Sequence, residues 1–464
     1  MATAFRRSFD DWGYLYMNTR QIAPGPRGDL LLGNLREFRR DVVGLMLRSA
    51  REYGNVVRFH LGPFVVHLLN HPDHVEHVLQ SGARNYDKAT RSSAKIRAIS
   101  GDSLLTSNGE LWKRQRRLMQ PSFHRQRIAG MAAEMIGFTD AMLQRWQTHL
   151  ANGEALDIAA EMMRLTYSIV GKTLLGADVG GDATAIERAM ETMLAHTYRS
   201  WGNLVDVPAF IPTPSNVRFR HALQAVDQIV YRIIAEHRAD GSTTNSNLLS
   251  VLLQVRDEQT GDGLSDNELR NETITFLLAG HETTANALAW TFYLLSQNPE
   301  VEQQLRAELS AVLSGRPPTV EDLAHLTLTT MVIQEAMRLY PPIWAIERRA
   351  IADDVIGGFH IPADSSVVIS PYVLHRNENF WPDAERFDPT RFNSRPRAYI
   401  PFGSGPRFCI GNEFAMMEAR LIVPMVMQAC HLELAEGYAA ELQPSITLRP
   451  KNGLRMNVCP APPL

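Results

Sequence analysis

The longest helical pattern in the sequence sets the scale of the fold. It begins at Ser265, which lies three residues before Glu268 in a capping-box arrangement, and it ends near Asn298, because Pro299 cannot continue a helix. At about 1.5 Å per residue such a helix is on the order of 50 Å long, enough to cross a whole domain. A chain that contains this helix has to build a large helical core around it.

Other parts of the chain predict both helices and strands. Apolar and polar residues alternate over 55–70, which predicts a β-hairpin, whereas residues 125–340 are mostly helical by period. Short β-like runs follow between 354 and 370, and one more helix is expected after Gly411. We therefore expect an α+β fold, mainly α, with a large helical domain and a smaller β-rich region.

The first 23 residues form a separate amphipathic segment by pattern. Four aromatic residues recur there at helical spacing, Phe5, Phe9, Trp12 and Tyr16, before the loop that starts at Pro24. Such a stripe can contact a membrane surface, although an apolar face more often packs on the protein itself. Residues 24–464 are expected to form a single domain.

Charge and cysteine content exclude several classes of partner. The 464 residues include 47 basic and 50 acidic ones, a net charge of −3, so the overall charge does not favour nucleic acid. Because no run of about 18 apolar residues occurs, we expect no transmembrane anchor. Three widely separated cysteines do not make a disulfide framework and fit a reducing compartment. We expect a soluble, cytoplasmic protein.

Residues 402–411 present one cysteine in a glycine-rich loop. Arg407 and the start of the following helix both favour the thiolate form of Cys409, and the thiolate is the form that binds iron. Three glycines allow the backbone to approach a flat cofactor without Cβ clashes: Gly403, Gly405 and Gly411. The alternative is a small buried cysteine in an ordinary turn, the interpretation that we adopt for Cys430 and Cys459.

The same loop resembles the haem-binding signature of the cytochromes P-450, F-x-x-G-x-R-x-C-x-G. The matching residues are Phe402, Gly405, Arg407, Cys409 and Gly411. Further motifs agree in order and spacing, so the resemblance extends from about residue 24 to the C-terminus. It implies the cytochrome P-450 fold, haem b as the cofactor and Cys409 as the iron ligand. It also implies that Phe402, Gly403, Arg407 and Gly411 contact the cofactor.

A second motif of this family is E-x-x-R, formed here by Glu335 and Arg338 inside an apolar helix. Arg386 lies in Asp-Ala-Glu-Arg-Phe, which is similar to the family's P-E-R-F segment, and the resemblance implies a buried network of the three that holds the haem loop. Glutamate and arginine at this spacing share a helix face, and a second arginine can use the remaining lone pairs of the carboxylate. On a surface such a pair is common, but if it is buried the loss of one partner costs about 3–5 kcal/mol.

Residues 279–284 resemble the family's oxygen-activation motif, A-G-x-[DE]-T. The resemblance places Ala279 against the cofactor and makes Glu282 and Thr283 the catalytic pair, because a carboxylate beside a hydroxyl can relay protons through water in an apolar pocket. The alternative is that Thr283 and Thr284 only bond back to carbonyls one turn earlier in the helix. Both interpretations can hold together.

Two further segments are similar to propionate-binding motifs. Trp112 and Arg116 form W-x-x-x-R on one helix face, and Arg348 matches another propionate ligand, although the adjacent Arg349 leaves the register ambiguous. Within and just after the first motif lie basic residues that form either a solvated helix face or a docking site for an acidic redox partner: Lys113, Arg114 and Arg117.

The resemblance implies a monooxygenase that uses O2 to oxidise a lipophilic small molecule such as a terpenoid or a fatty acid. No flavin or iron–sulfur motif is visible, so two electrons are expected from a separate ferredoxin or flavodoxin with its reductase, and the protein is expected to be a monomer. The pocket is expected to be bordered by 85–105, 195–215, 275–284 and 341–347, including Trp344. Two rival functions are a peroxide-driven peroxygenase and a haem gas sensor, and the Glu282–Thr283 pair disfavours both.

Overall fold

The computed structural model describes residues 21–152, 154–176, 183–203, 206–240, 247–257, 260–394 and 396–461. The aromatic stripe expected at residues 5–16 lies outside these ranges, so its role stays a prediction. The chain divides into two compact units, each described by itself below. The first contains Met1–Ser92, Ala345–Ala384 and Arg397–Phe408, and the second contains Ser93–Trp344, Glu385–Pro396 and Cys409–Leu464. A single domain over 24–464 stays a prediction.

The first unit is built on a five-stranded sheet. Its order is β1 (Val56–Leu61), β2 (Phe64–Leu69), β8 (Ser366–Ile369), β5 (Ile346–Ala350) and β3 (Tyr86–Asp87). The predicted hairpin is confirmed, because β1 and β2 pair antiparallel around Gly62, which has a φ of 61° that few residues other than glycine adopt. Strand β8 runs parallel to β2 and antiparallel to β5. The sheet thus joins residues from both ends of the chain.

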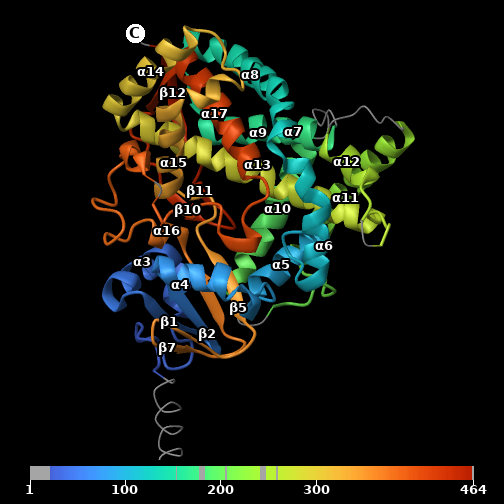
Figure 1. Ribbon diagram of the computed structural model, residues 1–464, viewed down its shortest axis with the longest axis vertical. Helices are drawn as coiled ribbons and strands as arrows, with labels where there is room; N and C mark the ends of the chain where they lie inside the picture. The colour runs from blue at the N-terminus through green and yellow to red at the C-terminus, as the bar shows by residue number, and fades with distance from the viewer. Residues whose placement is uncertain are drawn as a thin grey trace, which may run out of the picture. The chain divides into compact units, whose positions relative to one another are not determined.

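Short elements complete the first unit (Figure 1). They are α2 (Leu35–Arg40), α3 (Val42–Tyr53), α4 (Pro72–Glu76), η1 (His77–Ser81), η2 (Ala83–Asn85), β6 (Asp354–Ile356), β7 (Phe359–Ile361), α16 (Pro371–Leu374) and η6 (Gly405–Arg407). The pairing of β6 with β7 confirms the β-like run expected near residue 354.

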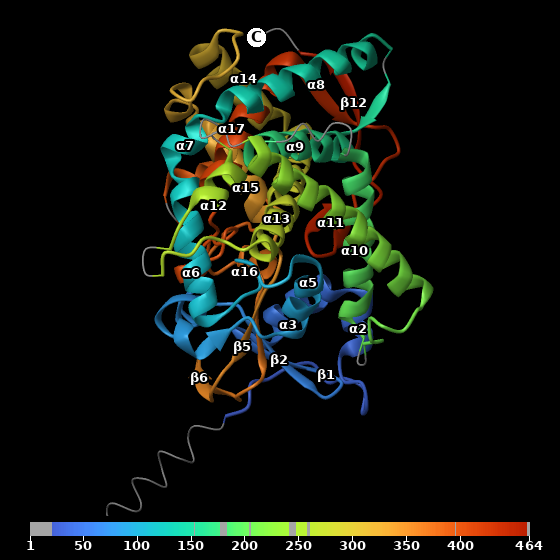
Figure 2. The same ribbon diagram turned by 90° about the vertical axis from the view of Figure 1, so that its right-hand side faces the viewer.

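The second unit is organised around α13 (Asp266–Ser296), the long helix that the sequence predicts. Ser265 caps it, and the reciprocal bonds between Ser265 and Glu268 form the expected capping box. Several helices pack against α13, among them α9 (Ile158–Leu175), α15 (Thr327–Leu339) and α17 (Asn412–Ala429). Figure 2 shows α13 lying among these helices. Most of its side chains are buried, as expected for a core helix.

Further helices of this unit cover the core. They are α5 (Arg91–Ser100, which begins in the first unit), α6 (Gly109–Met119), η3 (Gln120–Phe123), α7 (Arg125–Ala129), α8 (Ala132–Asn152), α10 (Ala183–Trp201), α11 (Pro214–Asp240), α12 (Leu248–Gln254), α14 (Pro299–Leu313), η4 (Asp322–Ala324) and η5 (Pro389–Asn393). The fold is mainly α with small sheets, as expected. None of the described helices combines the length and the apolar character needed to cross a lipid bilayer.

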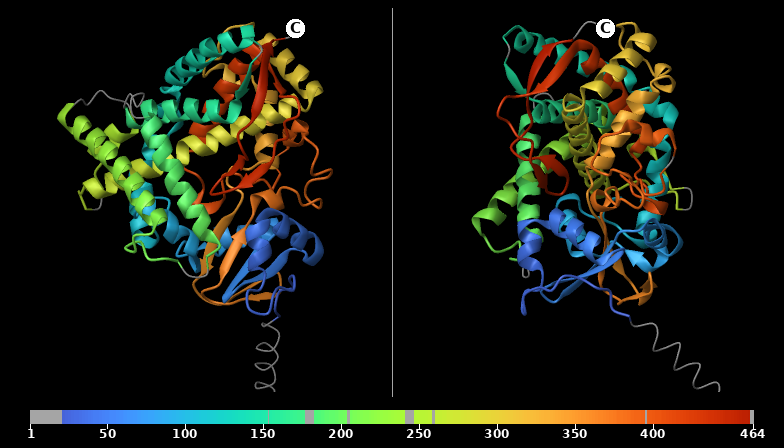
Figure 3. Two further views of the ribbon diagram at one scale, coloured as in Figure 1. Left: turned by 180° about the vertical axis from the view of Figure 1, so that it is seen from behind. Right: turned by 90° about the vertical axis from the view of Figure 1, so that its left-hand side faces the viewer.

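The second unit contains two small sheets, built from β4 (Ala155–Asp157) and from strands near the end of the chain. One has the order β4, β12 (Arg455–Pro460) and β9 (Cys430–Leu434), and the other is a hairpin of β10 (Leu442–Pro444) and β11 (Leu448–Pro450). Figure 3 shows these late strands beside the helices of the unit. Helix α17 precedes them and contains the buried Pro424, so it accommodates the lost backbone hydrogen bond and still reaches Ala429.

Candidate functional site

Cys409 lies two residues before the N-cap of α17. Its side chain is exposed, and the backbone N–H of Gly411 donates to its thiol. Burial by surrounding protein nevertheless raises the pKa of the Cys409 thiol, more than the Gly411 N–H and the Arg116 cation lower it. The expectation that Arg407 and the helix start would by themselves yield a low pKa is therefore wrong. The thiolate form needs a further positive charge, which a bound metal ion supplies.

The surroundings of Cys409 fit a flat cofactor. The Cys409 thiol is accessible, and yet enough protein surrounds it to raise its pKa. A Cβ atom added to Gly411 would meet nothing within 4 Å, so space is open beside the loop. The Arg116 guanidinium is close enough for its charge to act on the thiol. These observations in the second unit agree with the haem-thiolate loop expected from the sequence.

The centre of α13 has one open face in an otherwise buried helix. Ala279 is exposed and Thr283, one turn later, is partly exposed, whereas most of the helix around them is buried. The Thr283 hydroxyl donates to the carbonyl oxygen of Ala279 at 2.6 Å, and that of Thr284 donates to Gly280 at 3.2 Å. The back-bonding alternative is thus confirmed. It leaves two lone pairs on the Thr283 oxygen with which to bind water at the open face.

Glu282 turns away from this open face. Its side chain is buried, and its Oε1 atom accepts a hydrogen bond of 2.6 Å from the hydroxyl of Thr447. Asn286 donates to the same hydroxyl oxygen at 3.1 Å. The sequence analysis did not identify Thr447, because it lies 165 residues beyond Glu282 and belongs to no motif. The expected acid is present, held by neutral donors.

Helix α6 carries Trp112 and Arg116, both partly exposed. Burial lowers the pKa of Arg116, and the nearby Cys409 opposes this shift, so the two side chains are electrostatically coupled within the second unit. The arginine also donates to Gln120 at 3.3 Å. A partly desolvated cation on this helix face fits the expected contact with an anionic propionate.

The basic residues between Trp112 and Arg116, and just after, do not form a uniform free face. Arg114 pairs with Glu268 at 2.6 Å, and both Arg114 and Arg117 contact the carboxylate of Asp257, whose side chain is 1% exposed. Lys113 is the more open one, with a side chain 60% exposed beside Glu110. The predicted docking role is therefore narrowed to Lys113 and the outer part of Arg117.

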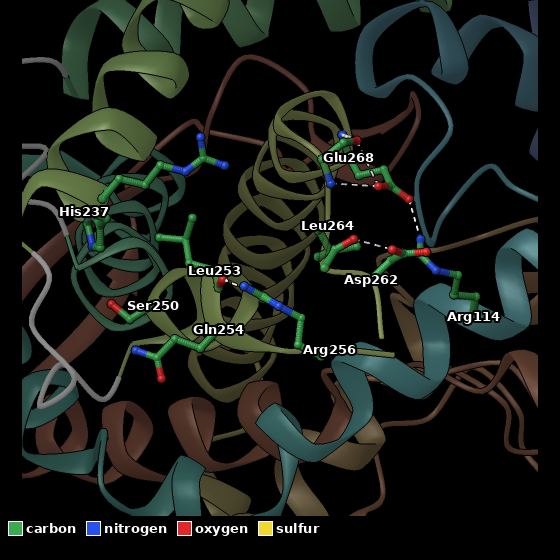
Figure 4. A pocket seen from close by; sticks show the side chains of 12 residues that line it. Arg114, His237, Ser250, Leu253, Gln254, Arg256, Asp262, Leu264 and Glu268 are labelled. Atoms are coloured by element: carbon green, nitrogen blue, oxygen red, sulfur yellow. Dashed lines mark hydrogen bonds and ion pairs between the residues drawn. The ribbon is translucent and has the colours of Figure 1, made fainter. Parts of the chain in front are cut away.

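Arg114 also borders a hollow of about 900 Å³ at the N-terminal end of α13 (Figure 4). Figure 4 shows Arg114 reaching towards Glu268, with Arg256 and Asp262 beside them. The hollow is lined mainly by polar residues and includes none of the residues expected around the cofactor. It lies near Ser265, more than three turns before Ala279, and so is separate from the candidate site.

The first unit contains three cations with shifted pKa values, of which Arg348 is buried and Arg407 and Lys88 are half-buried. Burial lowers the pKa of Arg348 to about 10 and that of Arg407 to about 9, where Arg348 adds to the effect. Burial beside both arginines also lowers the pKa of Lys88 well below its usual range. Three desolvated cations form an environment that a bound carboxylate would stabilise. Lys88 was missed because a single lysine carries no motif.

The ambiguity between Arg348 and Arg349 has a structural answer. Arg349 pairs with Asp87 at 2.7 Å and with Asp364 at 3.2 Å, so its charge is neutralised within the first unit. Arg348 is 8% exposed and donates to the carbonyl oxygen of Glu347. Of the two, Arg348 is the cation that still suits an anionic cofactor group.

The start of the signature loop is shaped by glycine. Gly403 and Gly405 have φ angles of 73° and 69°, which other residues rarely adopt. A Cβ atom at Gly405 would lie 1.8 Å from the carbonyl oxygen of Leu79, so this glycine serves packing within the first unit. Phe402 packs edge-on against Phe408, with ring centroids 6.4 Å apart. Gly411, in contrast, has a negative φ of −89°.

The E-x-x-R network is buried as expected, but its third member differs. Arg338 donates to Glu335 at 2.7 and 2.8 Å, and both side chains are 0% exposed. The second arginine on this carboxylate is Arg391, at 3.4 Å. Arg386 is exposed and contributes its backbone carbonyl, which accepts from Arg338 at 3.0 Å. The prediction of an Arg386 side chain in the network is therefore wrong.

A mainly helical fold with a single exposed cysteine before a core helix, and an acid–alcohol pair on the central helix, defines a haem-thiolate enzyme. Comparison with known proteins agrees: the family model Cytochrome P450 matches residues 23–456. The chain belongs to the cytochrome P450 family. As a member it is a haem-dependent monooxygenase that uses O2, an organic substrate and an electron-donating redox partner.

Several characterised bacterial proteins are similar over most of their length. Cyclooctatin synthase of Streptomyces melanosporofaciens is 36% identical over 87% of this chain and 88% of that protein. Cyclooctat-9-en-7-ol 5-monooxygenase of the same organism is 36% identical over 84% and 85%. Pentalenene oxygenase of Streptomyces avermitilis is 34% identical over 82% and 85%.

Proposed function

We propose that this chain oxidises a C–H bond of a terpenoid, with haem iron held by Cys409. The observation that carries the proposal is the exposed Cys409 thiol, whose pKa the surrounding protein raises, together with relatives whose names describe cyclooctatin synthesis and pentalenene oxygenation. Bound haem with a thiolate ligand supplies the activation of O2 and the insertion of one oxygen atom into the substrate.

The residues assigned to cofactor binding are proposed for each unit by itself, from their match to the family motifs. In the second unit Cys409 ligates the iron, while Gly411 and Ala279 leave space for the ring and Trp112 and Arg116 contact a propionate. In the first unit Arg348 and Arg407 bind propionate, with Lys88 as a third cation, and Phe402 and Gly403 support the loop. The support for the cations is their shared desolvation, which an anion would relieve.

Proton delivery is assigned to Glu282 and Thr283. Thr283 lies on the open face of α13, where its oxygen can orient a water molecule towards the reacting face. Glu282 is buried one position earlier and can pass a proton to that water after a change of rotamer. A peroxide-driven enzyme would not need this pair, which supports use of O2.

An apolar substrate is supported by an aromatic group in the second unit. The rings of Trp201 and Trp344 lie 6.4 Å apart, and Tyr198 lies 6.1 Å from Trp201. These residues belong to the segments expected to border the pocket. Aromatic faces of this kind bind the rigid hydrocarbon surface of a cyclic terpenoid and offer little to a polar substrate.

The electron donor is proposed to be a separate ferredoxin or flavodoxin with its reductase, docking near Lys113, whose charge is exposed. The protein is proposed to act as a monomer in the cytoplasm. Cys409, Cys430 and Cys459 are free cysteines, in keeping with a reducing compartment.

The first experiment is the visible spectrum of the dithionite-reduced protein with carbon monoxide, compared with Cys409→Ser. A strongly red-shifted Soret band that only the unsubstituted protein shows is expected for thiolate ligation. Binding and turnover are then measured with pentalenene, cyclooctat-9-en-7-ol and palmitic acid, using a surrogate ferredoxin and reductase. A red-shifted band that persists in Cys409→Ser overturns the ligand assignment, and turnover of palmitic acid alone overturns the substrate class.

A further inference from the structure

The hydroxyl of Thr447 connects the central helix to a hairpin late in the chain. Its Oγ1 atom lies 2.6 Å from Oε1 of Glu282, and both residues are 2% exposed. Asn286, one turn after Glu282 on α13, donates from Nδ2 to the same Oγ1 atom at 3.1 Å. Thr447 lies in the turn between β10 and β11, which packs against α13 (Figure 1).

The pattern of donors fixes the direction of the Thr447 hydrogen bond. A threonine hydroxyl has one proton to donate and two lone pairs to accept with. Because Asn286 already donates to Oγ1, the hydroxyl proton is directed to Glu282. Glu282 is thereby the acceptor, and the bond fixes the position of its carboxylate.

The turn that carries Thr447 is held in place without the help of Glu282. The indole N–H of Trp344 donates to the carbonyl oxygen of Ser445 at 2.8 Å, and that of Trp290 donates to Leu448 at 3.2 Å. Both tryptophans are buried. Thr447 is therefore a preorganised donor, and its position does not depend on where the carboxylate points.

Consecutive residues on a helix point about 100° apart, so Glu282 and Thr283 face different surroundings. Thr283 lies on the open face of α13, whereas Glu282 faces the hairpin and is closed off from solvent. A carboxylate that moved freely between the two directions would bring charge and water to the open face at all times. Uncontrolled proton delivery there releases hydrogen peroxide in place of product.

We propose that Thr447 is a positioning residue that holds Glu282 on the hairpin side of α13, so that the acid reaches water at Thr283 only when the hydrogen bond to Thr447 is broken. The proposal rests on the proposed function, because it assumes that Glu282 serves oxygen activation.

The variants to compare are Thr447→Val, which removes the hydroxyl but keeps the shape, and Thr447→Ser, which restores the hydroxyl. Thr291→Val is a matched control. Thr291 is a buried threonine on α13, the helix that carries Glu282, and its hydroxyl donates to the carbonyl oxygen of Ala287 at 2.7 Å instead of to Glu282. Thr447→Ala serves in place of Thr447→Val if the latter does not take up haem.

The haem-loaded proteins are supplied with NADPH, a surrogate ferredoxin and reductase, and cyclooctat-9-en-7-ol as the probe. In Thr447→Val the ratio of hydrogen peroxide to product is expected to rise about tenfold, because a hydrogen bond to a charged group is lost. Thr447→Ser is expected to return this ratio to that of the unsubstituted protein, and Thr291→Val to leave it unchanged. Equal ratios in Thr447→Val and Thr291→Val overturn the proposal.

A second measurement does not depend on turnover. Infrared difference spectra are recorded on photolysis of the carbon monoxide complex, and the carboxyl band of Glu282 is assigned by its loss in Glu282→Gln. The band is expected to change in Thr447→Val and to remain in Thr291→Val; identical bands overturn the proposal. A protein without the red-shifted carbon monoxide band would instead contradict the proposed function, so the two failures are distinguishable.

Discussion

Two buried glutamates of the second unit are held in opposite ways. Glu335 on α15 is 0% exposed and lies in a cage of fixed charge, with Arg338 at 2.7 Å and Arg391 at 3.4 Å. Glu282 on α13 is 2% exposed and receives a hydrogen bond from the neutral hydroxyl of Thr447. The two carboxylates share burial and differ in the charge of their partners.

The difference separates an acid held by fixed charge from one held by a neutral hydroxyl. Burial raises the pKa of Glu335 although Arg338 and Arg391 oppose the shift, and separating the pair would leave Arg338 as an uncompensated buried cation, which is strongly unfavourable. Opening the bond between Glu282 and the Thr447 hydroxyl leaves no buried cation behind, so Glu282 can move at a much smaller cost. The presence of an acidic residue and its partner therefore does not by itself show whether the acid has a structural or a chemical role. The charge of the partner distinguishes the two roles.

The largest expected effect comes from breaking the charged cage. Arg338→Leu leaves Glu335 buried without its main cation, and the free energy of unfolding is expected to fall by about 3–5 kcal/mol. Urea unfolding followed by circular dichroism measures the change, and haem content is expected to fall with it. Unchanged stability would show that Arg391 and the Asp388 N–H suffice to hold the carboxylate.

A second effect tests a carboxylate that has no cation at all. Glu272 on α13 is 0% exposed and accepts from the backbone N–H of Leu104 at 2.9 Å, and burial raises its pKa from 4.5 to about 8. Between these pH values the folded protein holds one more proton than the unfolded chain. The stability from this group is complete below pH 4.5 and is lost as the pH rises to 8, by on the order of 5 kcal/mol.

Glu272→Gln mimics the protonated acid and cannot ionise, so its stability should lack this slope. The measurement is urea unfolding of both proteins at several pH values between 4.5 and 8, and the quantity of interest is the difference between the two curves. That difference is expected to grow with pH in favour of the variant. Parallel curves would mean that Glu272 stays ionised in the folded protein.

A third effect concerns the chemistry on the open face of α13. Thr283→Ala removes the oxygen that is proposed to orient water, so product formed per NADPH consumed is expected to fall about tenfold, which corresponds to about 1.4 kcal/mol in the favoured pathway. Stability should change little, because the lost hydrogen bond to Ala279 is at a partly exposed position. Unchanged coupling of NADPH use to product would contradict the relay assignment.

Local patterns were enough to predict the parts of the fold that are set by neighbouring residues. The capping box at Ser265, the hairpin over 55–70 and the burial of the Glu335–Arg338 pair all depend on short spacings and are confirmed. The signature around Cys409 led to the family, and the family match over residues 23–456 confirms it. These features can be predicted because the residues that determine each of them lie within a few positions of one another in the sequence.

Features that depend on distant segments were missed or misassigned. Arg391 takes the place that we had given to Arg386, and the four residues between them belong to no α-helix, so no helical period predicts which arginine binds. Thr447 reaches Glu282 across 165 residues. The raised pKa of Cys409 depends on how much protein surrounds the thiol, which a loop sequence alone does not specify.

The smallest expected effect on stability tests whether burial, rather than the spacing of the two residues, sets the strength of an ion pair. Glu110 and Lys113 on α6 repeat the three-residue spacing of Glu335 and Arg338, and their N–O distance is also 2.7 Å, but their side chains are 87% and 60% exposed. Water screens such a pair, so Lys113→Ala should change the free energy of unfolding by less than about 0.5 kcal/mol. The measurement is the same urea titration used for Arg338→Leu. Reduction by a surrogate ferredoxin should slow and lose part of its dependence on salt, because Lys113 is the exposed cation proposed for docking. A large loss of stability would mean that spacing and distance, rather than burial, set the strength of these pairs, and it would remove the contrast between the two glutamates.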